Sequence, residues 1–299
     1  MYSYCLYGLN IESDIELRAL LPSRGEVDVV FRLGQIQNKP PLGDRKSIAH
    51  WSKKDAACIT YKDIATFLIQ NGNEIIIEPE YDKSLNDIVQ ILLGVAISVI
   101  LYQRGFLVLH CSLIEVDGYA IGFLGHSGFG KSSLATTFYE KGYHLISDDL
   151  GVIEFNNNDQ IDVYAGYPQF KLWSDTIETI GINPNDLPYI SSKYNKRTRL
   201  LTNRFVKSPR IPLKCLYVLD IGDEIEISEI KGYDAIIELV EFTFDIQLIE
   251  ITDGLAKHFD QCAKLAKSIT IKRLQRPWSL DSMPKIIQAI ENDVAQLEN

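Results

Sequence analysis

The sequence predicts an α/β protein in which a core with a mixed sheet follows a small β-rich module. Short runs of aromatic and β-branched residues fill roughly the first 80 positions, as is typical of strands. Beyond residue 105, strand patterns alternate with helical ones. A chain of 299 residues is long enough for one large domain and one small domain. We therefore expect an antiparallel β-rich module over residues 1–82 and a second domain over residues 83–299.

The composition argues against several classes of protein. Hydrophobic residues make up 46% of the chain and charged residues 23%, which excludes a fully disordered protein. The net charge of −10 argues against a non-specific nucleic-acid binder. Five dispersed cysteines without a CxxC pair are typical of reduced thiols, and no signal peptide is visible at the N-terminus. We expect a cytoplasmic protein without a nucleic-acid partner.

A long apolar helix is predicted over residues 83–104. Its most apolar stretch, Ile88–Tyr102, has 15 residues, which is short for a membrane span. We therefore expect a buried helix and no membrane association.

The elements after this helix are expected in a fixed order. A strand at 106–116, the tight turn Asp117-Gly118 and a second strand at 119–125 form a hairpin. A glycine-rich run, a helix at 131–141 and a strand at 143–147 follow. Further strands are expected on both sides of the turn 156–159 and within 212–230, with a polar loop at 190–210. The remaining helical patterns lie at 233–242, 254–268 and 282–297.

The glycine-rich run is the most specific motif in the chain. Residues 125–132, GHSGFGKS, fit the pattern GxxxxGK[ST] of a phosphate-binding P-loop, or Walker A motif. Glycines let backbone N–H groups turn toward phosphate oxygens, and the following helix adds its positive end. Lys131 is expected to reach the β- and γ-phosphates, and Ser132 to bind Mg²⁺. The predicted nucleotide contacts are Gly125, His126, Ser127, Gly128, Phe129, Gly130, Lys131, Ser132 and Ser133.

Two adjacent carboxylates follow the next strand. Asp148 and Asp149 lie 16 and 17 residues after Ser132, and a right-handed crossover would bring them beside the loop. One could hold Mg²⁺ and the other accept a proton from an attacking hydroxyl, although a polar strand end or a helix cap gives the same pattern. His110, on the strand before the loop strand, could orient Asp148 or could be an ordinary core histidine.

The stretch His110–Ile153 resembles the catalytic core of the HPr serine kinase/phosphorylases. The shared points are the histidine, the GxxGxGKS loop and the LISDD pair. The resemblance implies a kinase that uses ATP and Mg²⁺. It implies that Asp148 is the catalytic base, assisted by His110, and that Asp149 lies at the metal side with Ser132. Lys131 keeps its phosphate role.

Outside this stretch the chain departs from the bacterial HPr enzymes. Their glycine-rich signature is not seen after the acid pair, and residues 166–173 read GYPQFKLW instead. Together with YGLNIESDIEL at the start and PLKCLYVL at 212–219, this segment resembles the HPr-kinase-related lasso-peptide precursor kinases. That likeness implies a peptide acceptor with a C-terminal serine. The wider family also commonly assembles into homo-oligomers.

A basic segment stands out in this acidic chain. It contains no Asp or Glu and eight basic residues: Lys193, Lys196, Arg197, Arg199, Arg204, Lys207, Arg210 and Lys214. The segment could contact phosphates or an acceptor carboxylate, or it could be a solvated loop that balances acidic neighbours. Lys196, Arg197 and Arg199 are the densest group. Lys171 is a further candidate contact.

The sequence therefore favours an ATP- and Mg²⁺-dependent kinase that phosphorylates a serine of a peptide. Two alternatives remain open at this point. The acceptor could be an HPr-like protein or a small molecule, or the chain could be a non-catalytic ATP-binding switch in a peptide-modification system.

Overall fold

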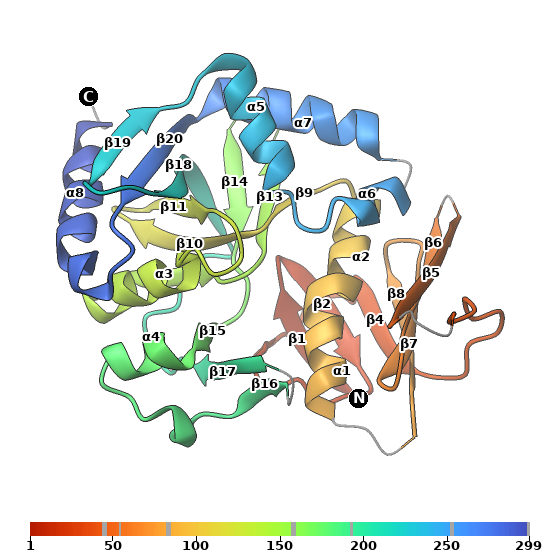
Figure 1. Cartoon of the computed structure of the whole chain (residues 1–299). Helices are drawn as coiled ribbons and strands as arrows, with labels where there is room; N and C mark the ends of the chain where they lie inside the picture. Colours follow the sequence, from red (N-terminus) through yellow and green to blue (C-terminus); the bar gives the residue numbers. More distant parts are fainter. Residues whose placement is uncertain are drawn as a thin grey trace. The chain divides into compact units, whose positions relative to one another are not determined.

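The chain folds into two compact units, drawn together in Figure 1. The first comprises Met1–Val108 and Phe244–His258, and the second Leu109–Thr243 and Phe259–Asn299. The computed structural model describes residues 1–43, 47–53, 55–81, 85–156, 160–191, 194–251 and 254–297. The boundary expected at residue 82 thus falls inside the first unit, because the helix after it packs within that unit.

The first unit is built on one eight-stranded sheet, with the order β3-β1-β2-β4-β8-β7-β6-β5. Strands β2–β4 and β4–β8 pair in parallel, so the expectation of a purely antiparallel module was wrong. The strands are β1 (Tyr2–Leu6), β2 (Leu9–Ser13), β3 (Leu21–Pro22), β4 (Val29–Leu33), β5 (Ile48–Lys53), β6 (Ala56–Tyr61), β7 (Ala65–Gln70) and β8 (Glu74–Pro79).

The apolar helix of this unit runs from Leu85 to Gln103 and contains a π-helical turn in its middle. It consists of α1 (Leu85–Ile91), the turn Leu92–Ala96 and α2 (Ile97–Gln103). By length and composition alone it could cross a membrane, with a mean hydropathy of 1.9. More than half of the stretch is buried, and α2 packs against β7 and α6 (Gln247–Ile251). The core helix of a soluble protein gives the same signal. Positions 83 and 84 of the predicted helix lie outside the described residues.

The second unit contains a mixed sheet with the strand order β12-β10-β11-β18-β14-β13, in which β20 also pairs with β18, and β19 pairs with β20. Its parallel pairs are β11–β18 and β18–β20, while β10 and β11 form an antiparallel hairpin. The α/β fold with a mixed sheet predicted from the sequence is therefore confirmed. The strands are β10 (Cys111–Val116), β11 (Tyr119–Leu124), β12 (His144–Ser147), β13 (Gly151–Phe155), β14 (Ile161–Tyr164), β18 (Arg210–Ile221), β19 (Glu226–Glu229) and β20 (Thr270–Arg276).

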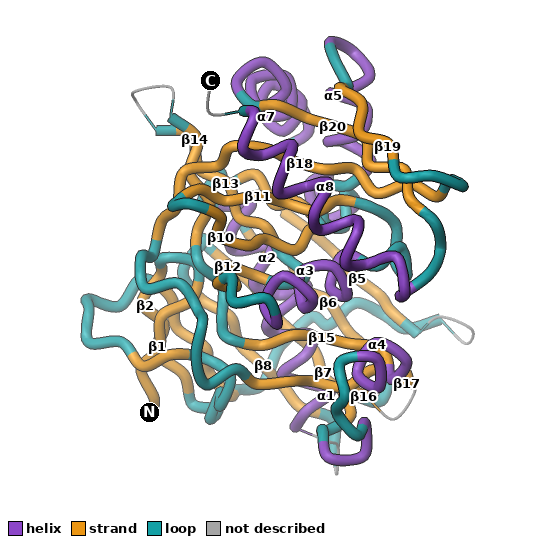
Figure 2. Tube along the Cα trace, turned by 90° about the vertical axis from the view of Figure 1, so that its left-hand side faces the viewer, coloured by secondary structure: helices purple, strands orange, loops and turns teal. Residues whose placement is uncertain are grey.

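Two helices pack against the sheet and complete the apolar core of this unit. Helices α3 (Lys131–Glu140) and α8 (Met283–Gln296) contact each other and contribute to one apolar cluster with the sheet (Figure 2). In that cluster the ring of Phe123 stacks on Phe138 and packs against Tyr217. The remaining helices are α4 (Ser174–Thr179), α5 (Gly232–Glu241) and α7 (Leu255–Ser268), with short 3-10 turns at Pro184–Asp186 and Leu280–Ser282. The helices predicted near 233–242, 254–268 and 282–297 are confirmed.

A separate three-stranded sheet lies in a region that the sequence predicted as loop. Strand β17 (Tyr194–Leu200) pairs with β15 (Gln169–Trp173) on one side and with β16 (Tyr189–Ser191) on the other. The loop prediction was wrong for these residues because β15, the partner of β17, is distant in the sequence. The turn predicted at 156–159 lies outside the described residues beyond Asn156.

Candidate active site

The site forms at one edge of the mixed sheet. Strand β10 runs antiparallel to both β11 and β12, so its first residues lie beside the last residues of its two neighbours. Cys111 pairs with Leu124 at the end of β11, and Leu113 pairs with Ser147 at the end of β12. The glycine loop leaves β11 at this edge, and the acid pair leaves β12. Ligands of open α/β sheets bind outside the carboxyl ends of strands, as here.

The glycine loop has the backbone geometry of an anion site. Gly128 and Gly130 adopt φ angles of 89° and 86°, which side chains disfavour. A Cβ on Gly130 would also come within 2.7 Å of Nη2 of Arg276. The ten-residue helix α3 starts directly after Gly130, so its unpaired N–H groups face the loop. The predicted phosphate loop therefore has the required strand-loop-helix context.

Lys131 is held against the loop that precedes it. Its Nζ donates to the carbonyl oxygens of Gly125 at 2.6 Å and His126 at 3.2 Å. Burial lowers the pKa of Lys131, while Asp149 and Asp148 act in the opposite direction. Backbone carbonyls are neutral acceptors, so a phosphate oxygen can replace them with a gain in Coulomb energy.

The side chains of the other loop residues divide into two groups. Ser127, Ser132 and Ser133 line the pocket above the loop. His126 instead places Nε2 at 3.2 Å from Glu241, and Phe129 packs edge-on against Trp278.

Asp148 is the buried member of the acid pair, with 4% of its surface exposed. Its carboxylate accepts hydrogen bonds from the Ser112 hydroxyl at 2.6 Å and from the Lys171 backbone N–H at 3.0 Å. Ser132 also lies close enough to lower the pKa of Asp148. Burial raises the pKa of Asp148 and outweighs these neighbours. The carboxylate therefore connects the segment after β12 to β10 and β15.

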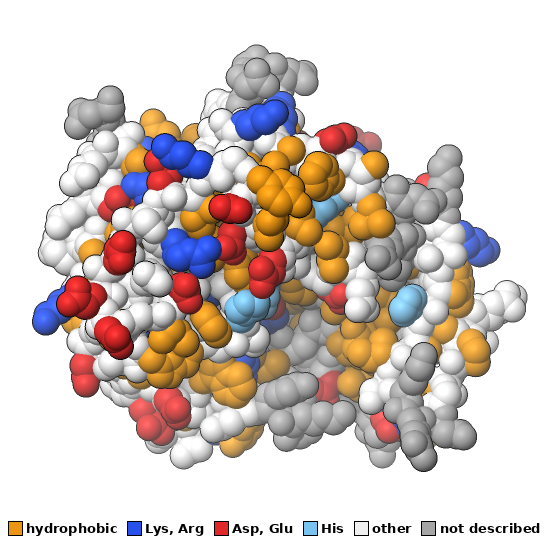
Figure 3. Space-filling view, turned by 45° about the horizontal axis from the view of Figure 1, so that its top comes forward, with side chains coloured by type: hydrophobic (Ala, Val, Ile, Leu, Met, Phe, Trp, Pro, Cys, Tyr) orange, Lys and Arg blue, Asp and Glu red, His pale blue; other side chains and the backbone are white. Residues whose placement is uncertain are grey.

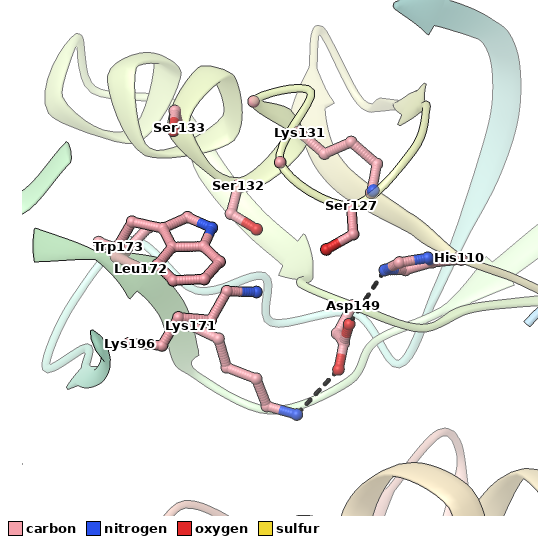
Figure 4. A pocket seen from close by; sticks show the side chains of 12 residues that line it. His110, Ser127, Lys131, Ser132, Ser133, Asp149, Lys171, Leu172, Trp173 and Lys196 are labelled. Atoms are coloured by element: carbon pink, nitrogen blue, oxygen red, sulfur yellow. Dashed lines mark hydrogen bonds and ion pairs between the residues drawn. The ribbon is translucent and has the colours of Figure 1, made fainter. Parts of the chain in front are cut away.

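Asp149 faces the pocket instead. Its backbone adopts φ 86°, an uncommon conformation that aspartate tolerates, and its side chain is 28% exposed. Nζ of Lys171 lies 2.8 Å from Oδ2, and Nε2 of His110 lies 3.3 Å from Oδ1 (Figure 4). Burial alone would raise the pKa of Asp149. Lys171 and His110 nevertheless hold this pKa well below its usual range. Asp149 is therefore ionised at neutral pH.

This geometry corrects two expectations about His110. The sequence paired it with Asp148, whereas the structure pairs it with Asp149. It also lies in a bend between β9 (Leu107–Leu109) and β10 instead of within one continuous strand. Ser112 is the residue of β10 that meets Asp148, and sequence reasoning missed it. Its spacing of two residues from His110 was the available signal, because alternate residues of an extended chain share a face.

One pocket, named the phosphate pocket here, is lined both by the glycine loop and by residues around Asp149. It is formed by His110, Ser127, Gly128, Gly130, Lys131, Ser132, Ser133, Asp149, Lys171, Leu172, Trp173 and Lys196. The loop and the acid pair expected to meet are thus brought together. Figure 4 shows the phosphate-loop serines and Asp149 lining one pocket, with Lys171 reaching Asp149.

Lys171 is the lysine that pairs with Asp149 of the acid pair. Its side chain is largely buried, and burial alone would lower its pKa, but Asp149 and then Tyr167 raise it above its usual range. Tyr167 is also buried. The expectation that Lys171 lies close to the site holds geometrically.

The basic segment contributes less to the pocket than its charge density suggested. Lys196 lines the pocket and places its ammonium 4.9 Å from the centre of the Trp173 ring. Arg197 is buried, donates to the Leu187 carbonyl at 2.9 Å and lies over a tyrosine ring. Arg199 pairs with Glu140 at 2.5 Å. The expectation that these two arginines contact substrate is therefore not supported by their positions.

Other cations of the segment also have protein partners. Arg204 donates to the Tyr139 carbonyl at 2.6 Å, Arg210 lies 3.0 Å from Glu154, and Lys214 lies over the Tyr119 ring. Lys193 lies outside the described residues. On the face drawn in Figure 3, basic and acidic side chains are interspersed.

The oxygen donors beside the loop suit a magnesium ion. Within the described ranges, no group of three His, Cys, Asp or Glu side chains is placed to hold a metal. Mg²⁺, however, needs only one or two protein oxygens, together with phosphate and water. The Ser132 hydroxyl and the Asp148 carboxylate, which lie close enough for Ser132 to lower the pKa of Asp148, form such a pair.

Comparisons with known proteins add little. No family model and no curated protein matches the chain. The solved structure of an Hpr(Ser) kinase/phosphatase from Coxiella burnetii aligns with a TM-score of 0.36 and 12% sequence identity. The alignment covers 64% of this chain and 99% of that chain. A likeness this weak decides nothing about the function of the chain.

Proposed function

We propose that the chain is a P-loop kinase that transfers the γ-phosphoryl group of ATP to a hydroxyl, with Mg²⁺, and that the acceptor is a serine of a peptide. One observation carries the proposal. Asp149, held by His110 and Lys171, lines the same pocket as the glycine loop and Lys131. A phosphate-binding loop and an ionised proton acceptor within one pocket are the two parts that phosphoryl transfer to a hydroxyl needs.

The loop and α3 bind the triphosphate. Backbone N–H groups of residues 125–132 would bind the phosphate oxygens, and the first turn of α3 would add its positive end. Lys131, which donates to two loop carbonyls, would hold the β- and γ-phosphates. Positioning and charge neutralisation supply most of the catalysis in this reaction class.

The metal is held by Ser132 and Asp148. Ser132 lies close enough to Asp148 to lower the pKa of that carboxyl, and Asp148 is only 4% exposed, so it is less accessible to an acceptor than Asp149. When bound, Mg²⁺ neutralises charge on the transferring phosphate. This assignment exchanges the roles that the family resemblance implied, in which Asp149 lies at the metal side.

Asp149 is then the catalytic base. It is the member of the acid pair that faces the pocket, and its pKa keeps it ionised at neutral pH. Such a carboxylate is a weak base, but a loose phosphoryl-transfer transition state needs little proton removal before the acceptor oxygen bonds. His110 orients the carboxylate. Lys171 holds it ionised.

The acceptor meets the side of the pocket formed by Trp173 and Lys196. The Lys196 ammonium has an aromatic partner there and remains available to an anionic group of the acceptor. A peptide that ends in serine carries such a group, its terminal carboxylate. The resemblance to the lasso-peptide precursor kinases supports this acceptor class.

An intact-mass assay tests the proposal. The protein is incubated with MgATP and peptides that end in serine, the same peptides amidated or ending in alanine, an HPr protein and free serine. We expect phosphate only on peptides with a free C-terminal serine. Phosphate on HPr or on free serine would keep the kinase and contradict the peptide acceptor. Bound ATP without transfer to any member would favour the nucleotide switch.

A further inference from the structure

Arg276 is a buried arginine at the end of β20 that contacts the glycine loop. Only 3% of its surface is exposed. Its Nη2 donates to the carbonyl oxygen of Phe129 in the loop, and its Nη1 donates to that of Pro277 at 3.3 Å. Strand β18 pairs with β11 on one side and with β20 on the other, so this side chain crosses the end of β18 to reach the loop (Figure 1). Arg276 is not among the residues that line the phosphate pocket.

Within the described part of the chain, the charge of Arg276 has no anionic partner. Buried cations are normally paired with carboxylates, because an unpaired buried charge is costly. Arg273, on the same strand, pairs with Asp220 at 3.2 Å and with Glu238. Arg276 instead meets carbonyl oxygens, and its buried Nε has no hydrogen-bond partner among the described residues. Burial lowers the pKa of Arg276, yet an arginine stays charged in proteins, so this part of the fold is short of one negative charge.

The contact with Phe129 fixes the orientation of one peptide group in the loop. In a planar trans peptide the C=O and N–H bonds point in opposite directions. The carbonyl of Phe129 points toward Arg276, so the N–H of Gly130 in the same peptide points away from Arg276. Gly130 lines the phosphate pocket and directly precedes α3, a position whose N–H groups are suited to phosphate.

We propose that Arg276 is a positioning residue for phosphate binding, an inference that rests on the proposed kinase function. It holds the Phe129 carbonyl away from the pocket, so that the Gly130 N–H stays directed at the phosphates. The bound triphosphate supplies the negative charge that the buried guanidinium lacks, across one peptide unit and without direct contact. Phosphate binding and the conformation of the loop are therefore coupled through Arg276.

Calorimetry with magnesium tripolyphosphate tests the role of the charge, because this ligand has no base or ribose and reports on the loop alone. Arg276→Gln removes the charge and shortens the side chain, whereas Arg276→Lys keeps a cation of similar reach. We expect the affinity to fall by about tenfold or more in Arg276→Gln and to stay within about threefold of wild type in Arg276→Lys. Arg273→Gln is the matched change on the same strand and should leave the affinity unchanged.

A single NMR signal tests the orientation of the peptide group. Phe129-Gly130 is the only Phe-Gly pair in the sequence. Protein with carbon-13 at the phenylalanine carbonyls and nitrogen-15 in glycine therefore gives one carbonyl-to-amide correlation, that of Gly130. In wild type, saturation with magnesium tripolyphosphate should move this amide proton downfield through its hydrogen bond to the anion. In folded Arg276→Gln at saturating ligand, this shift should be lost.

The outcomes separate this inference from the proposed function. Wild-type affinity and a wild-type Gly130 shift in folded Arg276→Gln would overturn the inference and leave the kinase proposal intact, as would equal losses in Arg276→Gln and Arg273→Gln. If Arg276→Gln does not fold, the wild-type signal decides, since an unmoved Gly130 amide at saturating tripolyphosphate overturns the inference. Failure of wild type to bind either tripolyphosphate or MgATP would overturn the inference together with the kinase.

Discussion

The glycine loop and the basic segment differ in how their residues are used. In the loop, glycines with positive φ and the start of the following helix together form a backbone geometry that is typical of anion sites. In the basic segment, charge density suggested a site, yet its described arginines contact protein partners and only Lys196, among its described members, lines the phosphate pocket. A contiguous backbone motif thus identifies a site better than clustered charge, because the partners of long side chains depend on tertiary structure.

The largest effect on activity is expected for a substitution in the glycine loop. Lys131→Ala removes the cation that we propose contacts the β- and γ-phosphates, so we expect phosphate transfer to fall by about 10²–10³-fold and ATP binding to weaken. Lys141→Ala is the matched control, since this exposed lysine just after the same helix pairs with Glu291. Equal losses in the two variants, measured by transfer and calorimetry, would argue against a specific role for the loop lysine.

A smaller effect is expected at the metal side. Asp148→Asn replaces one carboxylate oxygen of the proposed metal site with an amide nitrogen, so the Mg²⁺ concentration that gives half-maximal transfer should rise by about 10- to 100-fold. Titration of Mg²⁺ at saturating ATP measures this change. Unchanged Mg²⁺ dependence would remove Asp148 from the metal site.

Within the basic segment, Lys196 and Arg199 should behave differently. Lys196→Ala should raise the KM for a peptide acceptor by about tenfold, since it removes the proposed charge–charge contact with the acceptor carboxylate. Arg199→Ala breaks a half-exposed pair with Glu140, so it should cost at most about 1 kcal/mol of stability and leave KM unchanged. Kinetics and thermal melts distinguish the two. An equal KM effect would show that charge density, and not position, matters here.

The smallest effect concerns stability and pH. Burial raises the folded-state pKa of Asp148 above its unfolded value, so ionising this group costs stability as pH rises through the folded pKa. Asp148→Asn should therefore melt above wild type at pH 8, and the difference should shrink as pH falls toward about 4. The amide oxygen can still accept from the Lys171 N–H. A variant less stable than wild type at pH 8 would contradict this account.

Much of the second unit could be predicted because its signals are local. The Asp117-Gly118 hairpin, the glycine loop and the helix after it are contiguous in the sequence, and their geometry follows from nearby residues. The same locality identified the two acids, and the crossover rule placed them near the loop.

The assignment within the acid pair could not be predicted in this way. The positive φ of Asp149 turns its side chain toward the pocket, and neighbouring strands decide that His110 meets it while Ser112 meets Asp148. Strand β17 was missed for a similar reason, since its partner β15 is about 25 residues away. The parallel pairing of β4 also depends on distant strands.

The most direct test of the central claim is the rate of phosphate transfer from saturating MgATP by wild type and Asp149→Asn, followed by intact mass on the serine peptides. If Asp149 is the base of a kinase site at this sheet edge, wild type transfers phosphate, while the variant binds ATP normally and its transfer falls by about 10²–10⁴-fold. Transfer by Asp149→Asn at the wild-type rate would contradict the claim.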